Sequence, residues 1–343
     1  MNAYIHFVTS FSTPARLWFA VALLCVSCPA VAGNAAPPPE TPRTADAAGT
    51  AVARDRSAPD GKTKPRPAPE CLNLPGLVCF WDFQEEAGRP RRSRGPHAYA
   101  LEERQGSIER VAGGVWGPHS AHIDGGQWFC CPREACPALN IHGRDAEFTI
   151  LAWVQRTTDR RWQYIAGMWN ETEAERQYAL FVNGHRKTDW RTFTRTPADC
   201  QPHAYMSAGG GATPGNPFCF SYATGGTRLE KNRWYFLAAT YDQRELRVYV
   251  DGRLDALEHY NPFRYPGKPI FDGGANGADF TVAQRAVPSW PDYPDGKHDR
   301  PVGFAGRLGG LAVYRRALGA KEIQTIHLAA ERHRARSDKA QGR

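Results

Sequence analysis

Aromatic and polar side chains of the kinds that bind sugars gather in one part of the sequence. The indole of Trp169 offers a flat apolar face for a sugar ring, and the polar groups beside it supply donors and acceptors for hydroxyl groups. Residues 183–226 show little apolar periodicity, and we interpret them as a long insertion that walls the same face. The alternatives are a core tryptophan beside a polar hairpin and a surface flap. The predicted ligand-binding residues are Trp169, Asn170, Glu171, Arg176, Gln177, Tyr178, Tyr205 and Tyr222.

Acidic and basic side chains in the same region would suit two enzymatic chemistries. Glu171 and Glu175 alternate with Glu173, so on a strand they would face one way with α-carbons about 13 Å apart, and glycoside hydrolases use paired carboxylates. A lyase would instead need a Tyr or His to take a proton from an acidic sugar. A solvated acidic turn is the favoured interpretation of the three glutamates. The catalytic candidates are Tyr178, Glu171, Glu175, His185 and His203.

The cysteines predict disulfides. The chain has 9 cysteines, and two of them, Cys25 and Cys28, lie in a predicted export signal. The others would mostly pair in an oxidising compartment. We predict a bridge between Cys200 and Cys219, which would close a loop of about 20 residues. Three further cysteines lack the spacing of a zinc site, so no metal is expected there. Other pairings are Cys71 with Cys79, and Cys136 with Cys130 or Cys131.

Short strands must position these side chains. With 33 glycines and 27 prolines, the chain has many turn residues and few helix-forming runs. Residues 234–241 and 246–250 predict a hairpin with a four-residue loop. A helix is expected over residues 320–332, and no β-α-β alternation suggests a parallel sheet. Further strands are expected at 78–83, 148–154, 164–169, 177–182, 280–283 and 308–314.

Several motifs follow one another in a specific order. FTILAWV spans residues 148–154, NRWYFLAATYD and LRVYVDG span 232–242 and 246–252, and FAG, LAVY and RAL follow between 304 and 318. In this order they resemble the laminin-G-like jelly roll of the concanavalin A-like lectin and glucanase group. The resemblance implies an all-β, two-sheet antiparallel sandwich with a short C-terminal helix, and a sugar site on its concave face. Alternating strands with turn residues independently require a sandwich or a barrel.

The sequence departs from this family at a residue that helps to bind calcium. Many members carry an aspartate in the closing strand that helps to hold a structural calcium ion, whereas Gly309-Gly310 stands in that place here. We therefore expect no cofactor, and structural calcium is the disfavoured alternative. The remaining oxygen donors, each of which also suits a turn, are Asp124, Asp251, Asp272 and Asp279.

The first 70 residues predict export. Arg16 precedes a short apolar run, and Ala30-Val31-Ala32 fits signal peptidase cleavage, so residues 1–32 are interpreted as a signal peptide. The run is shorter than the about 20 residues of a membrane span, so no integral membrane segment is expected after cleavage. Residues 33–70 predict a disordered Pro/Ala-rich linker. The folded domain is expected over 71–331 and a basic tail over 332–343, in a secreted or periplasmic protein.

The net charge of +8 gathers partly in the linker and tail, where charges are usually solvated. No basic helix with interleaved aromatics indicates nucleic acid, so the expected partner is a polysaccharide or cell-surface glycan. Because fold does not fix function, three hypotheses follow. The first is a secreted carbohydrate-binding module. The second is a secreted polysaccharide lyase or glycoside hydrolase acting in the concave face, and the third is a structural adhesion protein.

Overall fold

A computed structural model describes part of the chain, and every residue it describes lies in the second of two compact units, Pro59–Arg343. The described residues are 68–124, 126–159, 162–171, 174–184, 200–215, 219–285, 302–340 and 342.

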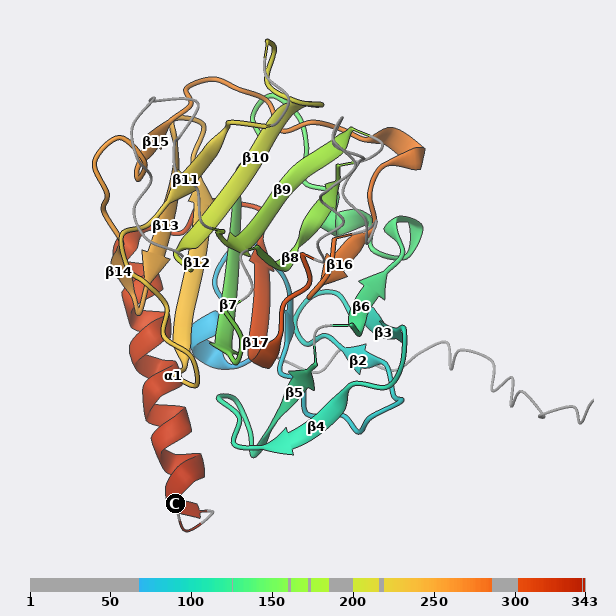
Figure 1. Cartoon of the computed structure of the whole chain (residues 1–343), viewed down its shortest axis with the longest axis vertical. Coiled ribbons are helices and arrows are strands. Elements are labelled where there is room, and N and C mark those ends of the chain that lie inside the picture. The colour runs from blue at the N-terminus through green and yellow to red at the C-terminus, as the bar shows by residue number, and fades with distance from the viewer. Residues whose placement is uncertain are drawn as a thin grey trace, which may run out of the picture. The chain divides into compact units, whose positions relative to one another are not determined.

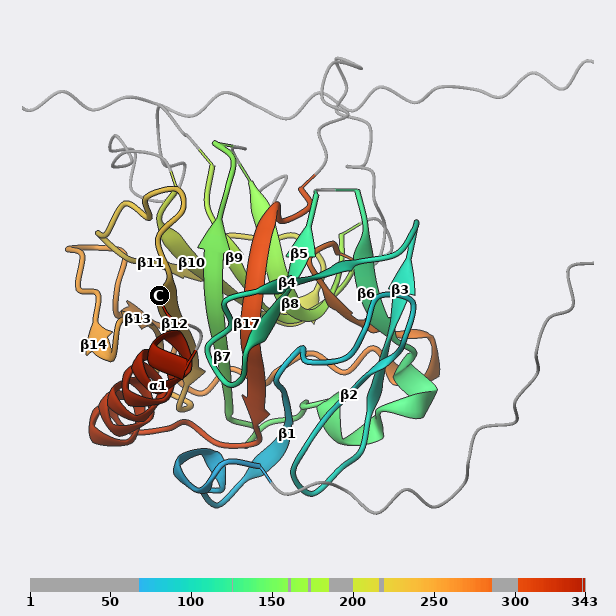
Figure 2. The ribbon, with the colours of Figure 1, turned by 90° about the horizontal axis from the view of Figure 1, so that it is seen from below.

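Two antiparallel sheets pack face to face (Figures 1 and 2), as the sequence predicts. Within the described residues, the nine-stranded sheet pairs in the order β14 (Arg253–Leu254), β13 (Glu245–Val250), β12 (Tyr235–Tyr241), β7 (Phe148–Arg156), β17 (Gly306–Tyr314), β5 (His119–Ile123) and β4 (Glu109–Ala112), with β1 (Leu77–Trp81) on β17 and β15 (Phe263–Arg264) on β13. The eight-stranded sheet pairs in the order β11 (Tyr222–Thr224), β10 (Pro202–Gly210), β9 (Glu175–Val182), β8 (Gln163–Asn170), β16 (Phe280–Val282), β6 (Trp128–Cys131), β3 (Ala100–Arg104) and β2 (Arg91–Arg92).

Strand periodicity divides the apolar side chains into an interior and two outer layers. In β7, Ile150, Ala152 and Val154 belong to the cluster between the sheets. The intervening Leu151 and Trp153 belong to a second cluster on the outer face of the nine-stranded sheet. Successive side chains of a strand point to opposite faces, so this strand is apolar on both sides because both of its faces are covered.

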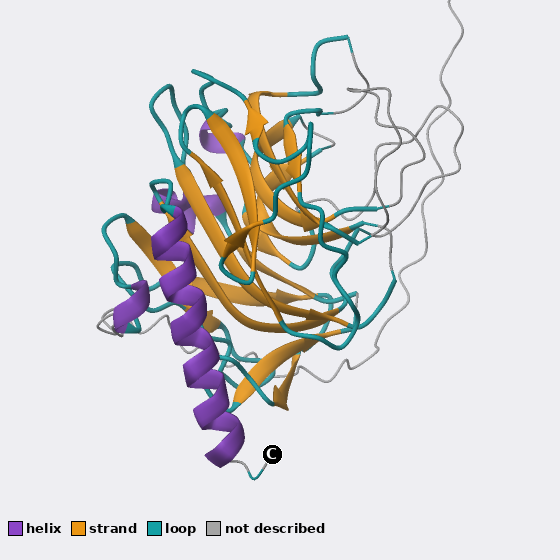
Figure 3. Ribbon diagram, turned by 90° about the vertical axis from the view of Figure 1, so that its left-hand side faces the viewer, coloured by secondary structure: helices purple, strands orange, loops and turns teal. Residues whose placement is uncertain are grey.

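One helix, α1 (Ala320–Ala340), lies along the outer face of the nine-stranded sheet (Figure 3). Its Ile323, Ile326 and Ala330 are buried in the outer cluster that contains Leu151 and Trp153. The helix continues beyond residue 332, through most of the segment predicted to be a basic tail. The Ala, Arg and Lys residues there are good helix formers, and Arg334 pairs with Glu331 one turn earlier at 2.9 Å.

The described residues also include four short 3₁₀ helices: η1 (Glu70–Leu72), η2 (Arg133–Ala135), η3 (Pro137–Leu139) and η4 (Gly274–Asn276). None of the helices in the described part of the chain has both the length and the apolar character that crossing a membrane requires.

The prediction that residues 183–226 form an irregular insertion is wrong for the part that the structure describes. This stretch contains β10 and β11, and β10 pairs with β9 so that Tyr205 lies opposite Ala179. The strand signal was present in the sequence, because Ala204 and Met206 alternate with His203 and Tyr205. The first pair is buried between the sheets and the second pair faces outward.

Two glycines of β17 make room for tryptophans. A Cβ atom on Gly309 would lie 2.7 Å from Val115 Cγ2, and one on Gly310 would lie 2.7 Å from Trp116 Cδ1 and 2.8 Å from Trp153 Cε3. Because these distances are shorter than carbon–carbon contact, only glycine fits without a rearrangement of Val115 or of the two indole rings. The pairing of β17 with β7 is irregular between Leu308 and Gly310.

Candidate functional site

The outer face of the eight-stranded sheet carries a continuous set of aromatic rings, which we call the aromatic cluster. Alternation in β9 explains its position, because Tyr178, Leu180 and Val182 are buried between the sheets while Ala179 and Phe181 face outward. The aromatic members of the cluster are Trp162, Tyr164, Trp169, Phe181, Tyr205, Phe220, Tyr222 and Tyr260.

Neighbouring rings of the cluster are in direct contact. The ring centroids of Trp169 and Tyr205 lie 5.0 Å apart, and those of Phe181 and Tyr205 lie 5.4 Å apart in an edge-to-face arrangement. The His203 ring lies 4.6 Å from that of Tyr222. Such pairs contribute about 0.5–1.5 kcal/mol each beyond the area that they bury. The structure therefore brings Trp169, Tyr205 and Tyr222 of the predicted site together.

Burial corrects one expectation about these residues. Trp169 is only 1% exposed, Tyr222 2% and Tyr205 7%, so Trp169 is a packed residue, as in the alternative of a core tryptophan, and not an open platform for a sugar ring. Trp162, just before β8, is partly exposed. Its ring lies 5.4 Å from the ring of His203 and 6.3 Å from that of Phe181. The cluster reaches the surface at Trp162, which the sequence did not single out although a tryptophan in a polar stretch before a strand was a usable signal.

Charged groups lie at the other end of β8. Glu171 accepts a hydrogen bond from Arg285 Nη1 and lies 3.9 Å from Arg176 Nε. Arg176 Nη1 also donates to the carbonyl of Gly210 at 3.2 Å, and Asn170 Nδ2 donates to Glu175 Oε2 at 3.3 Å. The predicted residues of the β8–β9 turn thus form a polar margin with Arg285, a residue that no local sequence pattern connects to them.

Two predicted site residues face the interior instead. Tyr178 packs against Phe148 with ring centroids 5.0 Å apart, and its hydroxyl donates to the Leu139 carbonyl at 2.8 Å. Burial raises the pKa of Tyr178 well above its usual value. A general base needs the opposite shift and access to substrate, so Tyr178 does not fit that role.

Gln177 is held inside the fold by a polar network. Its side-chain oxygen accepts from Arg133 Nη1 at 2.7 Å, and its Nε2 donates to Asn140 Oδ1 at 2.9 Å. The cause is an irregularity in the pairing of β8 with β9, where Met168 lies opposite Tyr178 but Trp169 lies opposite Arg176. This bulge lets Gln177 leave the alternation, which sequence periodicity could not predict.

The other catalytic candidates occupy different settings. His203 is buried, and its Nδ1 forms a hydrogen bond with Thr224 Oγ1 at 2.5 Å. Glu171 and Glu175 are engaged by different partners, guanidinium groups and the Asn170 amide respectively. His185 lies outside the described residues. The geometry therefore supports structural roles for Tyr178 and His203 more directly than proton transfer.

The structure does not contain the predicted Cys200–Cys219 bridge. Burial raises the pKa of the Cys219 thiol, while the Ser221 backbone and nearby Arg176 act in the opposite direction. Cys200 lies at the other end of β9, because Pro202 pairs with Val182. Arg176 and Val182 are six residues apart, roughly 20 Å along a strand, whereas a disulfide needs α-carbons within about 7 Å.

Three of the four aspartates considered for calcium have partners within the protein. Asp251 accepts from the backbone N–H of Phe236, Asp279 from that of Arg133 and Asp272 from that of Gly274. Asp124 is exposed. Within the described residues, no three His, Cys, Asp or Glu side chains are grouped as a metal site requires.

Comparison with known sequences places this fold in a family. The profile of the concanavalin A-like lectin/glucanases superfamily matches residues 134–324, more than half of the chain. The protein therefore belongs to the concanavalin A-like lectin/glucanases superfamily. No curated protein sequence matches the chain.

Solved structures give more distant matches. A Trypanosoma rangeli sialidase in complex with sialic acid aligns with 76% of this chain and 34% of its own, at 18% identity and a TM-score of 0.48. Domain 4 of AbnA, an extracellular arabinanase from Geobacillus stearothermophilus in complex with arabinotriose, aligns with 73% of this chain and 98% of its own, at 14% identity and a TM-score of 0.44. The chain thus spans about a third of the length of the sialidase.

Proposed function

We propose that this protein is a secreted or periplasmic carbohydrate-binding module that holds a glycan chain on the outer face of the eight-stranded sheet. The observation that supports this best is the aromatic cluster. Its rings are continuous across the face, and Trp162 brings them to the surface at one end. The Trp162 indole offers an apolar face and a polar N–H at the surface, which suit a ligand that has both apolar C–H faces and hydroxyl groups.

The length of the face favours an oligosaccharide over a single sugar. Trp162 and the polar margin around Asn170 and Glu171 lie at opposite ends of β8, about 25 Å apart at roughly 3.3 Å per residue. Trp162 would stack on one sugar unit, while Glu171, which is partly exposed and held by Arg176, would contact a hydroxyl group of a distant unit. Tyr205 and Tyr222 lie between them in this proposal and hold the face rigid.

Substitution of Trp162 tests the proposal. We expect Trp162→Ala to weaken binding to the best ligand of a polysaccharide panel by about 1–3 kcal/mol, or roughly 5–150-fold, since one stacked ring is lost. Affinity electrophoresis measures this directly. Trp128→Ala is the matched control, because Trp128 is also a partly buried tryptophan of the eight-stranded sheet but packs against the interior cluster.

Equal affinities of wild type and Trp162→Ala would contradict the proposed site. The same reactions can be assayed for reducing ends and for unsaturated products. Release of either by the wild type, and its loss in Glu171→Gln, would instead support the enzymatic alternative.

A further inference from the structure

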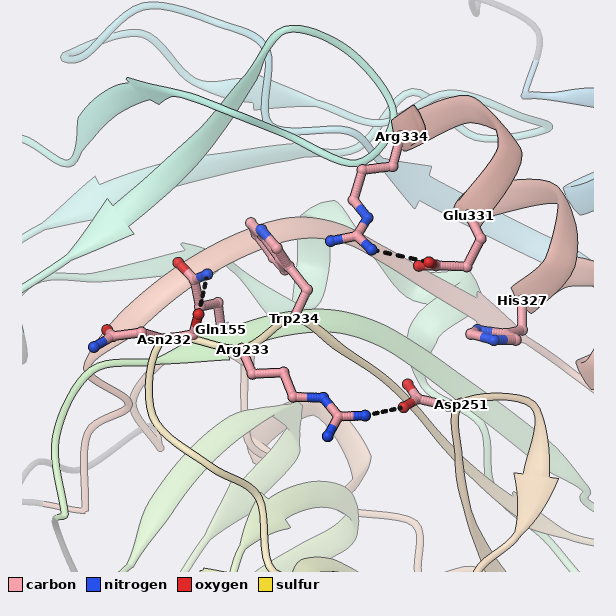
Figure 4. A pocket seen from close by; sticks show the side chains of 8 residues that line it. All are labelled: Gln155, Asn232, Arg233, Trp234, Asp251, His327, Glu331 and Arg334. Carbon is pink, nitrogen blue, oxygen red and sulfur yellow. Dashed lines mark hydrogen bonds and ion pairs between the residues drawn. The ribbon is translucent and has the colours of Figure 1, made fainter. Parts of the chain in front are cut away.

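A cavity of about 510 Å³ lies on the other side of the sandwich, where the chain enters β12 and α1 passes over it. Figure 4 shows side chains from β7 and from the turns next to β12 and β13 on one wall, and from α1 on the other. None of them belongs to the aromatic cluster. The lining residues are Gln155, Asn232, Arg233, Trp234, Asp251, His327, Glu331 and Arg334.

Trp234 is held in place at this cavity by the strand beneath it. A Cβ atom on Gly309 of β17 would lie 3.0 Å from Trp234 Cη2, so the outer edge of the indole packs directly on that glycine. The Arg307 guanidinium lies 5.4 Å from the ring centroid. Gln155 Nε2 donates to the Asn232 carbonyl at 2.9 Å and fixes the segment that leads into the ring. Packing therefore fixes the orientation of the Trp234 indole, which is half-buried.

The charged groups of the cavity occur as two pairs on facing walls. Arg233 lies 3.8 Å from Asp251 on the strand side, and Arg334 lies 2.9 Å from Glu331 on the helix side (Figure 4). Each guanidinium has a carboxylate beside it, so the four groups together carry no net charge. They still offer several planar donors and acceptors to a ligand. The Arg307 guanidinium at the Trp234 ring is already engaged by Ser120 and by the carbonyls of Ala112 and Gly113. The groups that line the cavity therefore favour an uncharged, hydroxyl-rich ligand over an anion.

The dimensions and composition fit a small saccharide. The volume lies within the about 300–1,000 Å³ that small-molecule sites usually occupy. One aromatic platform with polar groups around it can stack on a sugar ring and bind its hydroxyl groups at the same time.

We propose that this cavity is a second saccharide-binding site, which takes one or two units of a neutral glycan with Trp234 as the stacking platform. The inference shares with the proposed function only the class of ligand, since the two sites have no residue in common. They lie on the outer faces of different sheets. One copy of the protein can therefore hold two glycan chains or two parts of one chain, and linked sites of this kind gain avidity.

The indole N–H of Trp234 provides a local readout. We would titrate uncharged gluco-, galacto-, manno-, xylo- and arabino-oligosaccharides, and acidic oligosaccharides for comparison, into the whole mature protein with ¹⁵N-labelled tryptophan. The Trp234 signal would be identified with Trp234→Phe. We expect a saturable shift of this signal with at least one sugar. The shift should persist in Trp162→Ala, because that residue belongs to the other site.

A paired substitution tests the polar wall without a change of net charge. Glu331→Ala with Arg334→Ala should weaken the Trp234 response by about fivefold or more. The matched control is Glu102→Ala with Arg104→Ala, which removes a surface ion pair of the same length, 2.9 Å, from β3. The control should leave the response unchanged.

The outcomes separate the two proposals. If no neutral sugar shifts the Trp234 signal while binding still depends on Trp162, the second site is refuted and the proposed function stands. If Trp234 responds but Trp162→Ala never changes any affinity, the proposed function fails and the second site stands. A response only to acidic oligosaccharides would refute the inference of a neutral ligand.

Discussion

The outer faces of the two sheets are covered in different ways. On the nine-stranded sheet, Leu151 and Trp153 pack against apolar residues of α1, such as Ile326, so the chain supplies its own cover. On the eight-stranded sheet, aromatic rings pack mainly against one another and adjoin His203 and the Glu171 ion pairs. Both faces exclude water, but the second does so with side chains that have polar tips. Apolar packing therefore does not by itself distinguish a structural face from a ligand face, and the chemistry at the margins has to be compared.

Truncating the central tryptophan on each face gives the largest expected effect. Trp169→Ala and Trp153→Ala should each lower the free energy of unfolding by about 3–5 kcal/mol, because both rings are almost fully buried. Urea unfolding monitored by circular dichroism measures this. If Trp153→Ala lowers the free energy of unfolding as expected but Trp169→Ala leaves it unchanged, the aromatic cluster is not a packed layer.

Substitution of a cysteine near one end of β9 should have an intermediate effect on the free energy of unfolding. We expect Cys219→Ala to lower the free energy of unfolding by about 1 kcal/mol, the typical cost of a point substitution. Loss of a bridge across a 20-residue loop would cost roughly 3 kcal/mol. Peptide mapping under nonreducing conditions should yield no fragment that links Cys200 to Cys219, and recovery of such a fragment would show that the eight-stranded sheet is arranged differently.

Loss of the ion pair at the start of α1 gives the smallest expected change in the free energy of unfolding, and this change depends on pH. Two hydrogen bonds from Arg316, at 2.6 and 2.9 Å, lower the pKa of Glu322 below its ordinary value. A lowered carboxyl pKa stabilises the fold above the unfolded-state pKa of about 4.3 and loses this contribution as the pH falls below it. Because both side chains are partly exposed, Glu322→Gln should cost less than about 1 kcal/mol at pH 7.

Acid titration of the unfolding free energy checks this prediction. The difference between wild type and Glu322→Gln should shrink as the pH is lowered from 5 to about 3. A difference that is independent of pH would mean that the ion pair does not hold the helix.

Local signals in the sequence were sufficient for much of the fold. The hairpin of β12 and β13 was predictable because its apolar alternation and the short loop at residues 242–244 lie within one short segment. The start of α1 at Ala320 was predictable, but its C-terminal end was not, since charged helix formers after residue 332 also suit a solvated tail. β10 was not predicted, because its alternation covers only a short part of a long segment that otherwise shows little apolar periodicity.

The site was predictable only in part, and the failures have physical causes. Trp169, Tyr205 and Tyr222 lie on one face because strands alternate, and that rule can be applied from sequence. The bulge that turns Gln177 inward depends on how β8 pairs with β9. The contact of Arg285 with Glu171 joins residues far apart in the chain. Neither feature follows from local composition.

The glycine pair of β17 also constrains how this sequence can change over time. A Cβ atom added at Gly309 would meet Val115 and Trp234, and one added at Gly310 would meet Trp116 and Trp153. A carboxylate ligand for a cation could not be introduced at either glycine without displacing a neighbouring side chain. At Gly310, room for it would first require a smaller residue in place of Trp116 or Trp153, and loss of either ring would destabilise the fold. A change at either glycine of β17 therefore depends on an earlier change among the side chains that pack on it.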